Sequence, residues 1–338
     1  MSLFKKIFRG ISWTVVALIL LVCLILAFFD IMRHFRENDA ASAVAPATGH
    51  FVKAADADVF VQEAGPSDGP AVVLIHGTGS WGEIWRDTID PLAKEGYHVI
   101  AIDFTPFGYS MKFTEAADYT LRKQAARIVG IFTAMRIEHA TLVAHSIGSR
   151  PAVEAVLENP NLVDKLILVA PALGYPKSAE AAFEFQQNNP SFLVGFIFGH
   201  PGVRNTIIST YGTNPLFIKR IFSSFVFDKK SITDARTNVI KQPMSVKKTT
   251  EAYGAWLQNL LTAQDDSLAS DFNNLKKLSM PVDLIWGDKD AVTPLWAGKK
   301  LQALLLHSEM TVIPNVGHMP YLENVGDFNK ALLYYLKK

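Results

Sequence analysis

Residues 141–149 read T-L-V-A-H-S-I-G-S, and this stretch decides how the rest of the chain is interpreted. Its apolar first half predicts a short strand that ends at Ser146, and residues 147–157 are compatible with a helix. A strand that stops at a serine and turns at once into a helix is typical of a nucleophile elbow, where small residues flank the serine. Gly148 meets that requirement, and Ala144 stands where the usual G-x-S-x-G pattern has glycine.

The same turn predicts a place for chemistry. It would lift the hydroxyl of Ser146 away from the sheet and put the backbone N–H of Ile147 at a helix N-terminus. A donor there can stabilise a developing oxyanion. The alternative is an ordinary strand-to-helix turn in which Ser146 is only an N-cap, so the rest of the chain has to decide.

Apolar runs alternate with helix-compatible segments on both sides of this turn. Continuous apolar runs are typical of strands buried on both faces, and their alternation with helices predicts a parallel sheet with right-handed crossovers. Residues 50–63 predict an antiparallel hairpin at the sheet edge. We expect strands at 71–75, 97–102, 141–144, 165–170, 282–286 and 310–313, and helices at 121–135 (with Asp118 as N-cap), 147–157, 295–306 and 324–336.

The alternation stops after Pro171. Residues 172–271 are helix-prone and broken at several prolines, and we predict that they form a helical lid over the C-terminal edge of the sheet. The core would then consist of residues 50–171 and 272–338. The phenylalanines of this predicted lid are Phe183, Phe185, Phe192, Phe196, Phe198, Phe217, Phe222, Phe225 and Phe227.

With these elements the chain resembles the α/β-hydrolase family, from about residue 50 to the C-terminus. The resemblance implies a mostly parallel twisted sheet flanked by helices, and it rests above all on the order Ser, Asp, His at successive strand ends. Ser146 takes the nucleophile position. Asp290, in W-G-D-K-D-A-V-T-P, matches the acid, and His318, in P-N-V-G-H-M-P, matches the catalytic histidine.

The chemistry needs these three residue types together. A serine hydroxyl is a poor nucleophile unless a base accepts its proton, and histidine can both take and return that proton near neutrality. A carboxylate on the far ring nitrogen fixes the tautomer. Each residue alone has an ordinary explanation, since an aspartate in a D-K-D loop is usually solvated or capping. The assignment therefore depends on finding all three in this order.

Two further loops match the family. The segment His76-Gly77-Thr78-Gly79 resembles its H-G-x-G oxyanion loop, which implies that the backbone N–H of Thr78 is the second oxyanion donor. His76 itself is expected to be structural. Residues 103–110 resemble a structural loop of the family beside the pocket. His145 and Asp288 are expected to shape the pocket and not to take part in the reaction.

Composition limits the classes of function. The chain has 338 residues, 49% of them hydrophobic, and a formal net charge of +1, which argues against a nucleic-acid partner. Its one cysteine, Cys23, lies in the apolar N-terminal run, which leaves no disulfide or cysteine metal site for the folded part. No H-E-x-x-H, P-loop or dinucleotide fingerprint occurs, so we expect no metal and no cofactor.

Residues 11–29 contain no charged side chain and are long enough to cross the hydrocarbon core of a bilayer as a helix. They predict a retained single-span anchor within residues 1–37. A cleaved signal peptide is the alternative, but small-residue cleavage patterns occur only well beyond the run. The flanking basic residues slightly favour a non-cytoplasmic catalytic domain. Residues 38–49 are small and polar and predict a flexible linker.

These features together predict a membrane-anchored serine hydrolase that cleaves carboxylic esters, of apolar character, through an acyl-enzyme on Ser146. The alternatives are a cofactor-free hydrolase of carbon–carbon bonds, a perhydrolase with the same triad, and a membrane-tethered ligand-binding protein that kept the fold. The aromatic character of the predicted lid also suggests that it touches the bilayer through residues 192–203.

Overall fold

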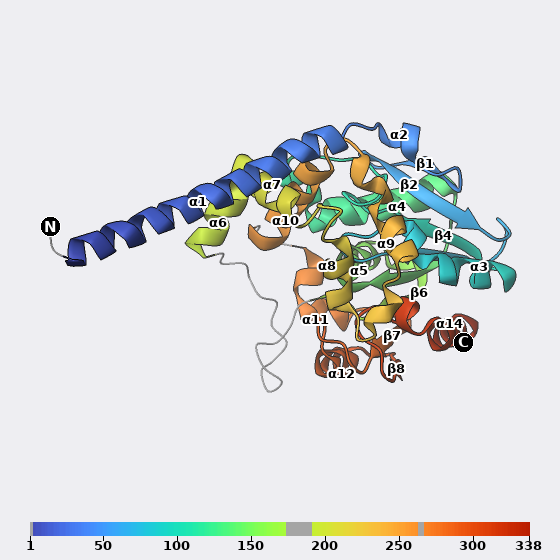
Figure 1. The fold of residues 1–338 in the computed structure, drawn as a ribbon. Coiled ribbons are helices and arrows are strands. Elements are labelled where there is room, and N and C mark those ends of the chain that lie inside the picture. Colours follow the sequence, from blue (N-terminus) through green and yellow to red (C-terminus); the bar gives the residue numbers. More distant parts are fainter. Residues whose placement is uncertain (1–2, 174–190, 263–266) are drawn as a thin grey trace.

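The computed structural model describes residues 3–173, 191–262 and 267–338 (Figure 1). Phe183 and Phe185, two phenylalanines of the predicted lid, lie outside these residues. The described chain contains one sheet of eight strands in the order β1-β2-β4-β3-β5-β6-β7-β8. The strands are β1 (Gly49–Ala54), β2 (Ala57–Ala64), β3 (Ala71–Ile75), β4 (His98–Ile102), β5 (Ala140–His145), β6 (Val163–Val169), β7 (Val282–Gly287) and β8 (Met310–Ile313).

The sheet is parallel from β4 to β8, and the predicted hairpin is confirmed at its edge. β1 pairs antiparallel with β2, and β2 pairs antiparallel with β4. Because the parallel strands run in one direction, their carboxyl ends meet at one edge of the sheet. This edge is where the loops after β3, β5, β7 and β8 come together.

Helices cover both faces of the sheet. α4 (Leu121–Met135), α5 (Ser149–Glu158) and α12 (Leu295–Leu304) contribute to the core on one face, whereas α3 (Arg86–Lys94) and α14 (Val325–Lys337) contribute to the core on the other. Successive residues of β3 point to opposite faces, and all are buried from Val72 to Ile75, as the continuous apolar run predicts.

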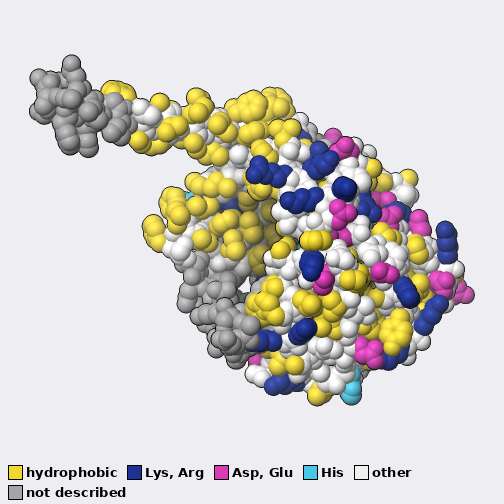
Figure 2. Space-filling model, turned by 60° about the horizontal axis from the view of Figure 1, so that its bottom comes forward, with side chains coloured by type: hydrophobic (Ala, Val, Ile, Leu, Met, Phe, Trp, Pro, Cys, Tyr) yellow, Lys and Arg dark blue, Asp and Glu magenta, His cyan; other side chains and the backbone are white. Residues whose placement is uncertain are grey.

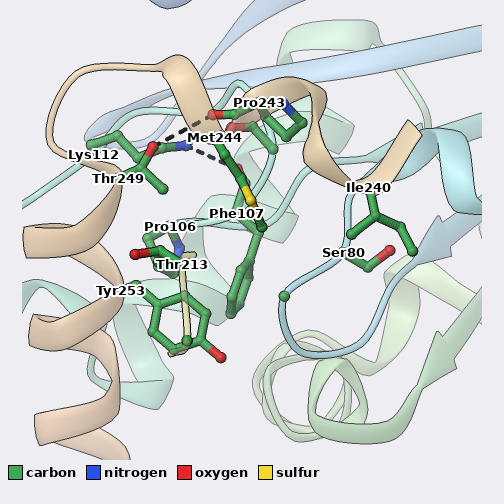
Figure 3. Close-up of a pocket in the computed structure, with 13 residues that line it drawn as sticks. Ser80, Pro106, Phe107, Lys112, Thr213, Ile240, Pro243, Met244, Thr249 and Tyr253 are labelled. Atoms are coloured by element: carbon green, nitrogen blue, oxygen red, sulfur yellow. Dashed lines mark hydrogen bonds between the residues drawn. The ribbon is translucent and has the colours of Figure 1, made fainter. Parts of the chain in front are cut away.

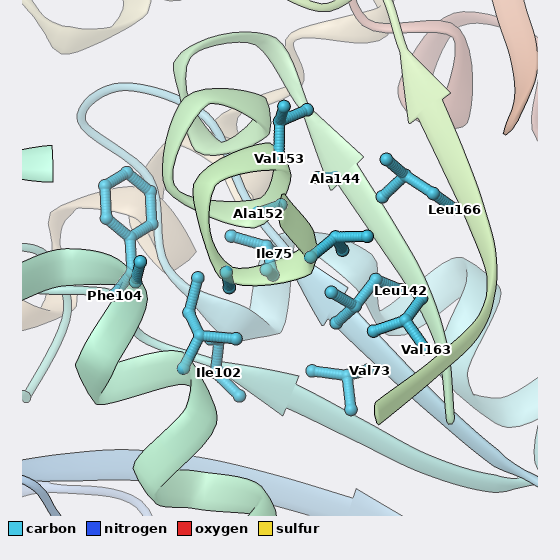
Figure 4. Close-up of a cluster of buried hydrophobic side chains, with 14 of the residues drawn as sticks. Val73, Ile75, Ile102, Phe104, Leu142, Ala144, Ala152, Val153, Val163 and Leu166 are labelled. Carbon is cyan, nitrogen blue, oxygen red and sulfur yellow. The ribbon is translucent and has the colours of Figure 1, made fainter. Parts of the chain in front are cut away.

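α5 packs closely on the strands that it joins (Figure 4). The small side chains of Ala144 and Ala152 lie among Ile75, Leu142 and Val153, and each of these five is fully buried. Burial of a large aliphatic side chain contributes about 1.5–3 kcal/mol to folding. The packing of α5 therefore fixes the turn that precedes it.

Between β6 and β7 the described residues form helices and no strand. They are α6 (Phe192–Gly199), α7 (Pro201–Thr210), α8 (Ile218–Phe225), α9 (Asp234–Lys241), α10 (Thr249–Thr262) and α11 (Phe272–Leu275). We refer to residues 172–271 as the insertion. In Figure 1 its helices lie between α1 and the sheet.

α1 (Leu3–Arg36) is longer than the apolar run, because it continues as one helix through Asp30, Arg33 and Arg36. The Arg33 guanidinium bridges Asp30 and Glu251 of α10, with N–O distances of 2.7 and 2.5 Å. Just beyond the helix, the carboxylate of Glu37 accepts hydrogen bonds from the backbone N–H and the hydroxyl of Thr250. The end of α1 is thus bonded directly to the insertion.

The prediction of a flexible linker at residues 38–49 is wrong. Residues Ala41–Val44 form the short helix α2, and Asp39 makes a β-bridge with Val246. Ala41 and Val44 pack against the buried ring cluster around Phe60 and Trp81. Small polar composition did not reveal these contacts, because the partners lie far away in the sequence.

Two remaining local features complete the fold. α4 begins at Thr120, whose hydroxyl accepts from the Lys123 amide, so the prediction that Asp118 is the N-cap is wrong by two residues. Asp118 instead forms an ion pair with Lys123. α13 (Pro320–Glu323) is a short helix that directly follows the loop carrying His318 and precedes α14.

Candidate active site

Ser146 lies at the turn between β5 and α5 with a backbone φ of 53°. A non-glycine residue in this left-handed region is uncommon, and such strain at the end of a strand is typical of a nucleophile elbow. Two backbone contacts hold the turn. The Ser149 hydroxyl donates to the Ala144 carbonyl, and the Ala172 amide donates to the Ser146 carbonyl.

His318 lies in the loop between β8 and α13, and its side chain is buried. Its Nε2 is 2.9 Å from the Ser146 hydroxyl, and its Nδ1 is 2.8 Å from Oδ2 of Asp290. The tautomer that satisfies both contacts carries the proton on Nδ1 and accepts the serine hydroxyl at Nε2. The three side chains therefore form one line of hydrogen bonds across the sheet edge.

Asp290 occupies the loop between β7 and α12, where its carboxylate receives four hydrogen-bond donors. Oδ1 accepts from the amides of Val292 and Thr293, each at 2.8 Å, and Oδ2 accepts from the Thr293 hydroxyl at 2.6 Å as well as from His318. The turn D-x-x-T explains this arrangement, since a carboxylate readily accepts from amides two and three residues later. Sequence reasoning missed Thr293, although this spacing was visible.

The neighbouring Asp288 points elsewhere. Its carboxylate forms an ion pair with Lys289 at 3.2 Å and accepts from the Val316 amide at 3.3 Å, and its side chain is partly exposed. The structure therefore brings Asp290, and not Asp288, to His318. This is the aspartate that the family resemblance implied.

The loop of His318 is held by Glu323, a residue that sequence reasoning did not single out. One carboxylate oxygen of Glu323 accepts from the amides of Gly317 and Met319, and the other accepts from Phe227 and Asp228 of the insertion. The His318 amide itself donates to the Phe225 carbonyl at the end of α8. The insertion and the histidine loop are thus joined by several hydrogen bonds.

His145 also supports His318, from the side of β5. Its Nε2 donates to the His318 carbonyl at 2.9 Å, and its Nδ1 accepts from the Tyr321 hydroxyl at 3.1 Å. Burial, together with the nearby His318 ring, holds the pKa of His145 well below its ordinary value, so this imidazole stays neutral. His145 therefore positions the backbone of His318 and makes no contact with the serine hydroxyl through its own ring nitrogens.

The predicted oxyanion loop lies directly against the elbow. A Cβ placed on Gly77 would be 3.1 Å from the Cβ of Ser146, and one placed on Gly148 would overlap the His76 carbonyl. Glycine at both positions permits this close approach of the residue 76–79 loop to the turn at Ser146. His76 is completely buried, and burial lowers its pKa to about 3.

The loop of residues 103–110 supports the same region from below. Asp103 is buried and accepts from the amides of Gly82 and Tyr109, at 2.6 and 2.8 Å. Gly108 has a positive φ of 55°, and any Cβ there would overlap the Asp103 carboxylate. The Nζ of Lys112 closes the loop by donating to the carbonyls of Phe107, Gly108 and Ser110.

A small cavity of about 30 Å³ lies between this loop and the insertion (Figure 3). Figure 3 shows Phe107 and Tyr253 on one side of it and Ser80 with Ile240 on the other. A cavity of this size holds about two water molecules. It is therefore too small to be the binding site of an ester substrate.

Among the residues that the structure describes, no group of three or more His, Cys, Asp or Glu side chains is arranged to hold a metal ion. Ser146, His318 and Asp290 contact one another directly through hydrogen bonds.

Comparisons with known proteins find the same fold. A sequence model described as the alpha/beta hydrolase fold matches residues 70–325. An uncharacterized hydrolase, YugF, of Bacillus subtilis is 27% identical over 77% of this chain and 89% of its own length. A 2-hydroxy-6-oxononadienedioate/2-hydroxy-6-oxononatrienedioate hydrolase of Paraburkholderia xenovorans is 27% identical over 88% of this chain and 99% of its own length.

Solved structures share the fold at low sequence identity. The 2-hydroxy-6-oxo-6-phenylhexa-2,4-dienoate hydrolase of Rhodococcus sp. strain RHA1 superposes with a TM-score of 0.66 at 22% identity, covering 86% of this chain and 98% of its own. A membrane phospholipase A superposes with a TM-score of 0.68 at 21% identity and covers 98% of both chains. The second match therefore extends over the N-terminal helix as well as the sheet.

Proposed function

Because this chain belongs to the α/β-hydrolase fold family, we propose that it is a serine hydrolase that cleaves carboxylic esters through an acyl-enzyme on Ser146. The observation that carries the proposal is the line of hydrogen bonds from Ser146 through His318 to Asp290. In this arrangement the Ser146 oxygen attacks the ester carbonyl carbon while His318 Nε2 takes the hydroxyl proton.

The same residues complete the reaction. The protonated His318 returns its proton to the departing alcohol as the carbon–oxygen bond breaks, which leaves the acyl group on Ser146. A water molecule then attacks the acyl carbon, with His318 again as the base, and releases the acid. Asp290 keeps the ring oriented and stabilises the imidazolium.

Ile147 and Thr78 are proposed to donate their amides to the oxyanion. The close approach of the Gly77 loop to Ser146 supports this assignment. Each such donor contributes about 3 kcal/mol to stabilising the transition state in comparable enzymes.

The side chains above the oxyanion loop favour an apolar substrate. A Cβ at Gly79 would lie 3.9 Å from the Phe222 ring and 4.0 Å from the Tyr253 hydroxyl. The Phe225 ring lies 6.3 Å from the His318 ring. Aromatic walls of this kind bind the acyl or alcohol chain of an ester through apolar contact.

Labelling with a fluorophosphonate tests the nucleophile, because this reagent forms a covalent bond with an activated serine. We expect the wild type to label and to hydrolyse p-nitrophenyl esters, with a preference for longer acyl chains. Ser146→Ala should abolish both, whereas Ser308→Ala, which removes a hydroxyl before β8 at the opposite edge of the sheet, should keep the label. Protein that folds but neither labels nor turns over would favour a ligand-binding protein with the same fold.

The names of several relatives favour a second candidate, a hydrolase of carbon–carbon bonds in 2-hydroxy-6-oxo-dienoic acids. Such an enzyme can use the same three residues. Assay of a vinylogous diketone beside the ester panel separates the two, since kcat/KM should be higher for the physiological class. If kcat/KM is higher for the diketone, the carbon–carbon hydrolase replaces the esterase as the proposed function.

We also propose that α1 anchors the protein in a membrane as a single span, with the catalytic domain on the non-cytoplasmic side. Residues Trp13–Arg36 form a helix long and apolar enough to cross a bilayer. Digestion of intact and permeabilised cells with protease tests this topology. We expect the protease to cleave the domain in intact cells, or in cells from which only an outer membrane has been removed. Protection of the domain until the inner membrane is opened would show that the domain lies on the cytoplasmic side.

A further inference from the structure

α6 and α7 carry large apolar side chains that face solvent. Phe192 and Leu193 are 89% and 63% exposed, and no side chain of α6 is fully buried. On α7 the exposed apolar residues recur every four positions, which puts them on one face of the helix. The insertion apolar face consists of Phe192, Leu193, Phe196, Val203, Ile207, Tyr211 and Leu216.

This face lies beside α1. The residues of α1 that are shielded by the domain are spaced as one helical face, namely Leu26, Phe29, Asp30, Arg33, Arg36 and Glu37. The Phe29 ring lies 6.4 Å from the Phe217 ring, which in turn lies 5.4 Å from Tyr211. Figure 2 shows the yellow side chains of α1 next to a yellow patch in the place that α6 and α7 occupy in Figure 1.

The contact between α1 and the insertion also sets the depth at which the insertion would lie in the membrane. Leu26 and Phe29 belong to the uncharged run of residues 11–29, which would occupy the hydrocarbon core. Side chains of the insertion that pack on these two residues would then lie at the edge of that core. A helix pair with one apolar face at this depth suits a bilayer surface, where such faces are buried by about 5–10 Å.

The charges around the face agree with this environment. Residues 191–227 contain no Asp or Glu, and the side chain of Arg220 is exposed, whereas Arg204 is buried and Lys219 forms an ion pair with Asp234. Lys247 and Lys248, which precede α10, are exposed. Basic residues beside an apolar face are attracted to anionic lipid headgroups, and the stretch offers no carboxylate that the headgroups would repel.

We propose that the insertion apolar face is a second membrane-contact surface, embedded in the same bilayer that α1 spans. The occupant is lipid, because the face adjoins the exposed apolar side chains of α1 through the rings of Phe29, Phe217 and Tyr211. The inference rests on the proposed anchor. It adds that the insertion is held in the membrane interface and does not stand away from the bilayer. Substrate dissolved in the membrane would then reach the protein from the bilayer side.

Depth-dependent quenching tests this surface with the full chain in vesicles of phosphatidylcholine and phosphatidylglycerol. In a Cys23→Ser background, an environment-sensitive fluorophore is attached to Leu193→Cys or to Phe196→Cys. Leu306→Cys is the matched control, since Leu306 is 67% exposed and closely follows α12, a helix that lies far from α1 in Figure 1. The native Cys23, labelled in otherwise unchanged protein, reports the span itself.

We expect lipids with a nitroxide near the headgroup to remove most of the emission at positions 193 and 196 and none at position 306. Position 23 should respond more strongly to a nitroxide deep in the acyl chain. Quenching at 23 without quenching at 193 and 196 would overturn this inference and leave the anchor standing. No quenching at any position would overturn both. Shielding of 193 and 196 that does not respond to the lipid quenchers would assign the face to a second copy of the chain, and so would also overturn the inference.

Discussion

Asp290 and Asp288 lie two positions apart in one loop, yet only Asp290 contacts His318. We predict that Asp290→Asn lowers kcat by about 10⁴, because the amide favours the wrong tautomer of the histidine. Asp288→Asn is the control and should change kcat little, since its partners are Lys289 and a backbone amide. Steady-state kinetics on a p-nitrophenyl ester measures both, and equal losses would contradict the assignment.

His76 makes the stability depend on pH. Its pKa is about 3 in the fold and 6.5 in an unfolded chain, because burial disfavours the charged ring. The unfolded state therefore takes up the proton first, so the contribution is fully present above pH 6.5 and is lost as the pH falls toward 3. Between pH 7.5 and 5 the loss is about 2 kcal/mol.

Denaturant unfolding at pH 7.5 and pH 5.0, followed by tryptophan fluorescence, measures this effect. His76→Phe keeps a ring of similar shape against Phe104. In this variant the free energy of unfolding should differ between the two pH values by about 2 kcal/mol less than in the wild type. An unchanged difference would mean that other groups cause the pH dependence.

Single residues could be predicted from sequence where a motif fixes their place in a turn. Ser146, Asp290 and His318 follow the parallel strands β5, β7 and β8, so their positions along the chain already implied one sheet edge. Thr293 was detectable from its spacing to Asp290. Glu323 and Tyr321 were not, because Glu323 joins the histidine loop to Phe227 and Asp228, and Tyr321 contacts His145, and no pattern within residues 314–324 names these distant partners.

At the scale of elements, Glu323 connects α13 with the insertion and the histidine loop. Glu323→Ala would leave four amides without their shared acceptor, and we predict a loss of about 1.5–3 kcal/mol in the free energy of unfolding. We also expect slower fluorophosphonate labelling, because the His318 loop would be less well ordered.

The controls distinguish this role from ordinary surface charge. Glu323→Gln keeps one acceptor oxygen and should restore part of the labelling rate. Glu95→Ala removes an exposed ion pair with Lys337, for which less than about 1 kcal/mol is expected. A labelling rate that falls equally in Glu95→Ala would contradict a specific role for Glu323.

The strands of the core were the elements most accessible to sequence reasoning. Apolar runs at 71–75 and 310–313 match β3 and β8 without any change of boundary. The errors fall where tertiary contacts, and not local preference, order the chain. Residues 41–44 are the main example, since Ala41 and Val44 gain their order from Phe60 and Trp81.

At the scale of the whole molecule, the N-terminal segment belongs partly to the folded domain. We predict that a chain lacking residues 1–28 unfolds with nearly the wild-type free energy, because it keeps Arg33 and Glu37. A chain lacking residues 1–40 should lose about 2–4 kcal/mol, since Thr250 and Glu251 lose their partners. Thermal or denaturant unfolding of the two truncated proteins compares them.

Full-length Glu37→Gln tests the same contact without truncation. It should be destabilised by a smaller amount than the longer deletion, because the amide can still accept one hydrogen bond. Equal stability of the two truncated chains would show that residues 29–40 contribute nothing to the domain.

The hydrogen bonds that join Phe225 to His318, and Phe227 and Asp228 to Glu323, have a consequence for how this protein can diversify. A segment that selects the substrate is often treated as an interchangeable module, to be transplanted between homologues while the catalytic apparatus stays the same. In this protein, replacing the insertion would remove hydrogen bonds that support His318, the general base. Recombination at residues 172 and 271 would therefore alter turnover as well as selectivity unless residues 314–324 were inherited from the same parent.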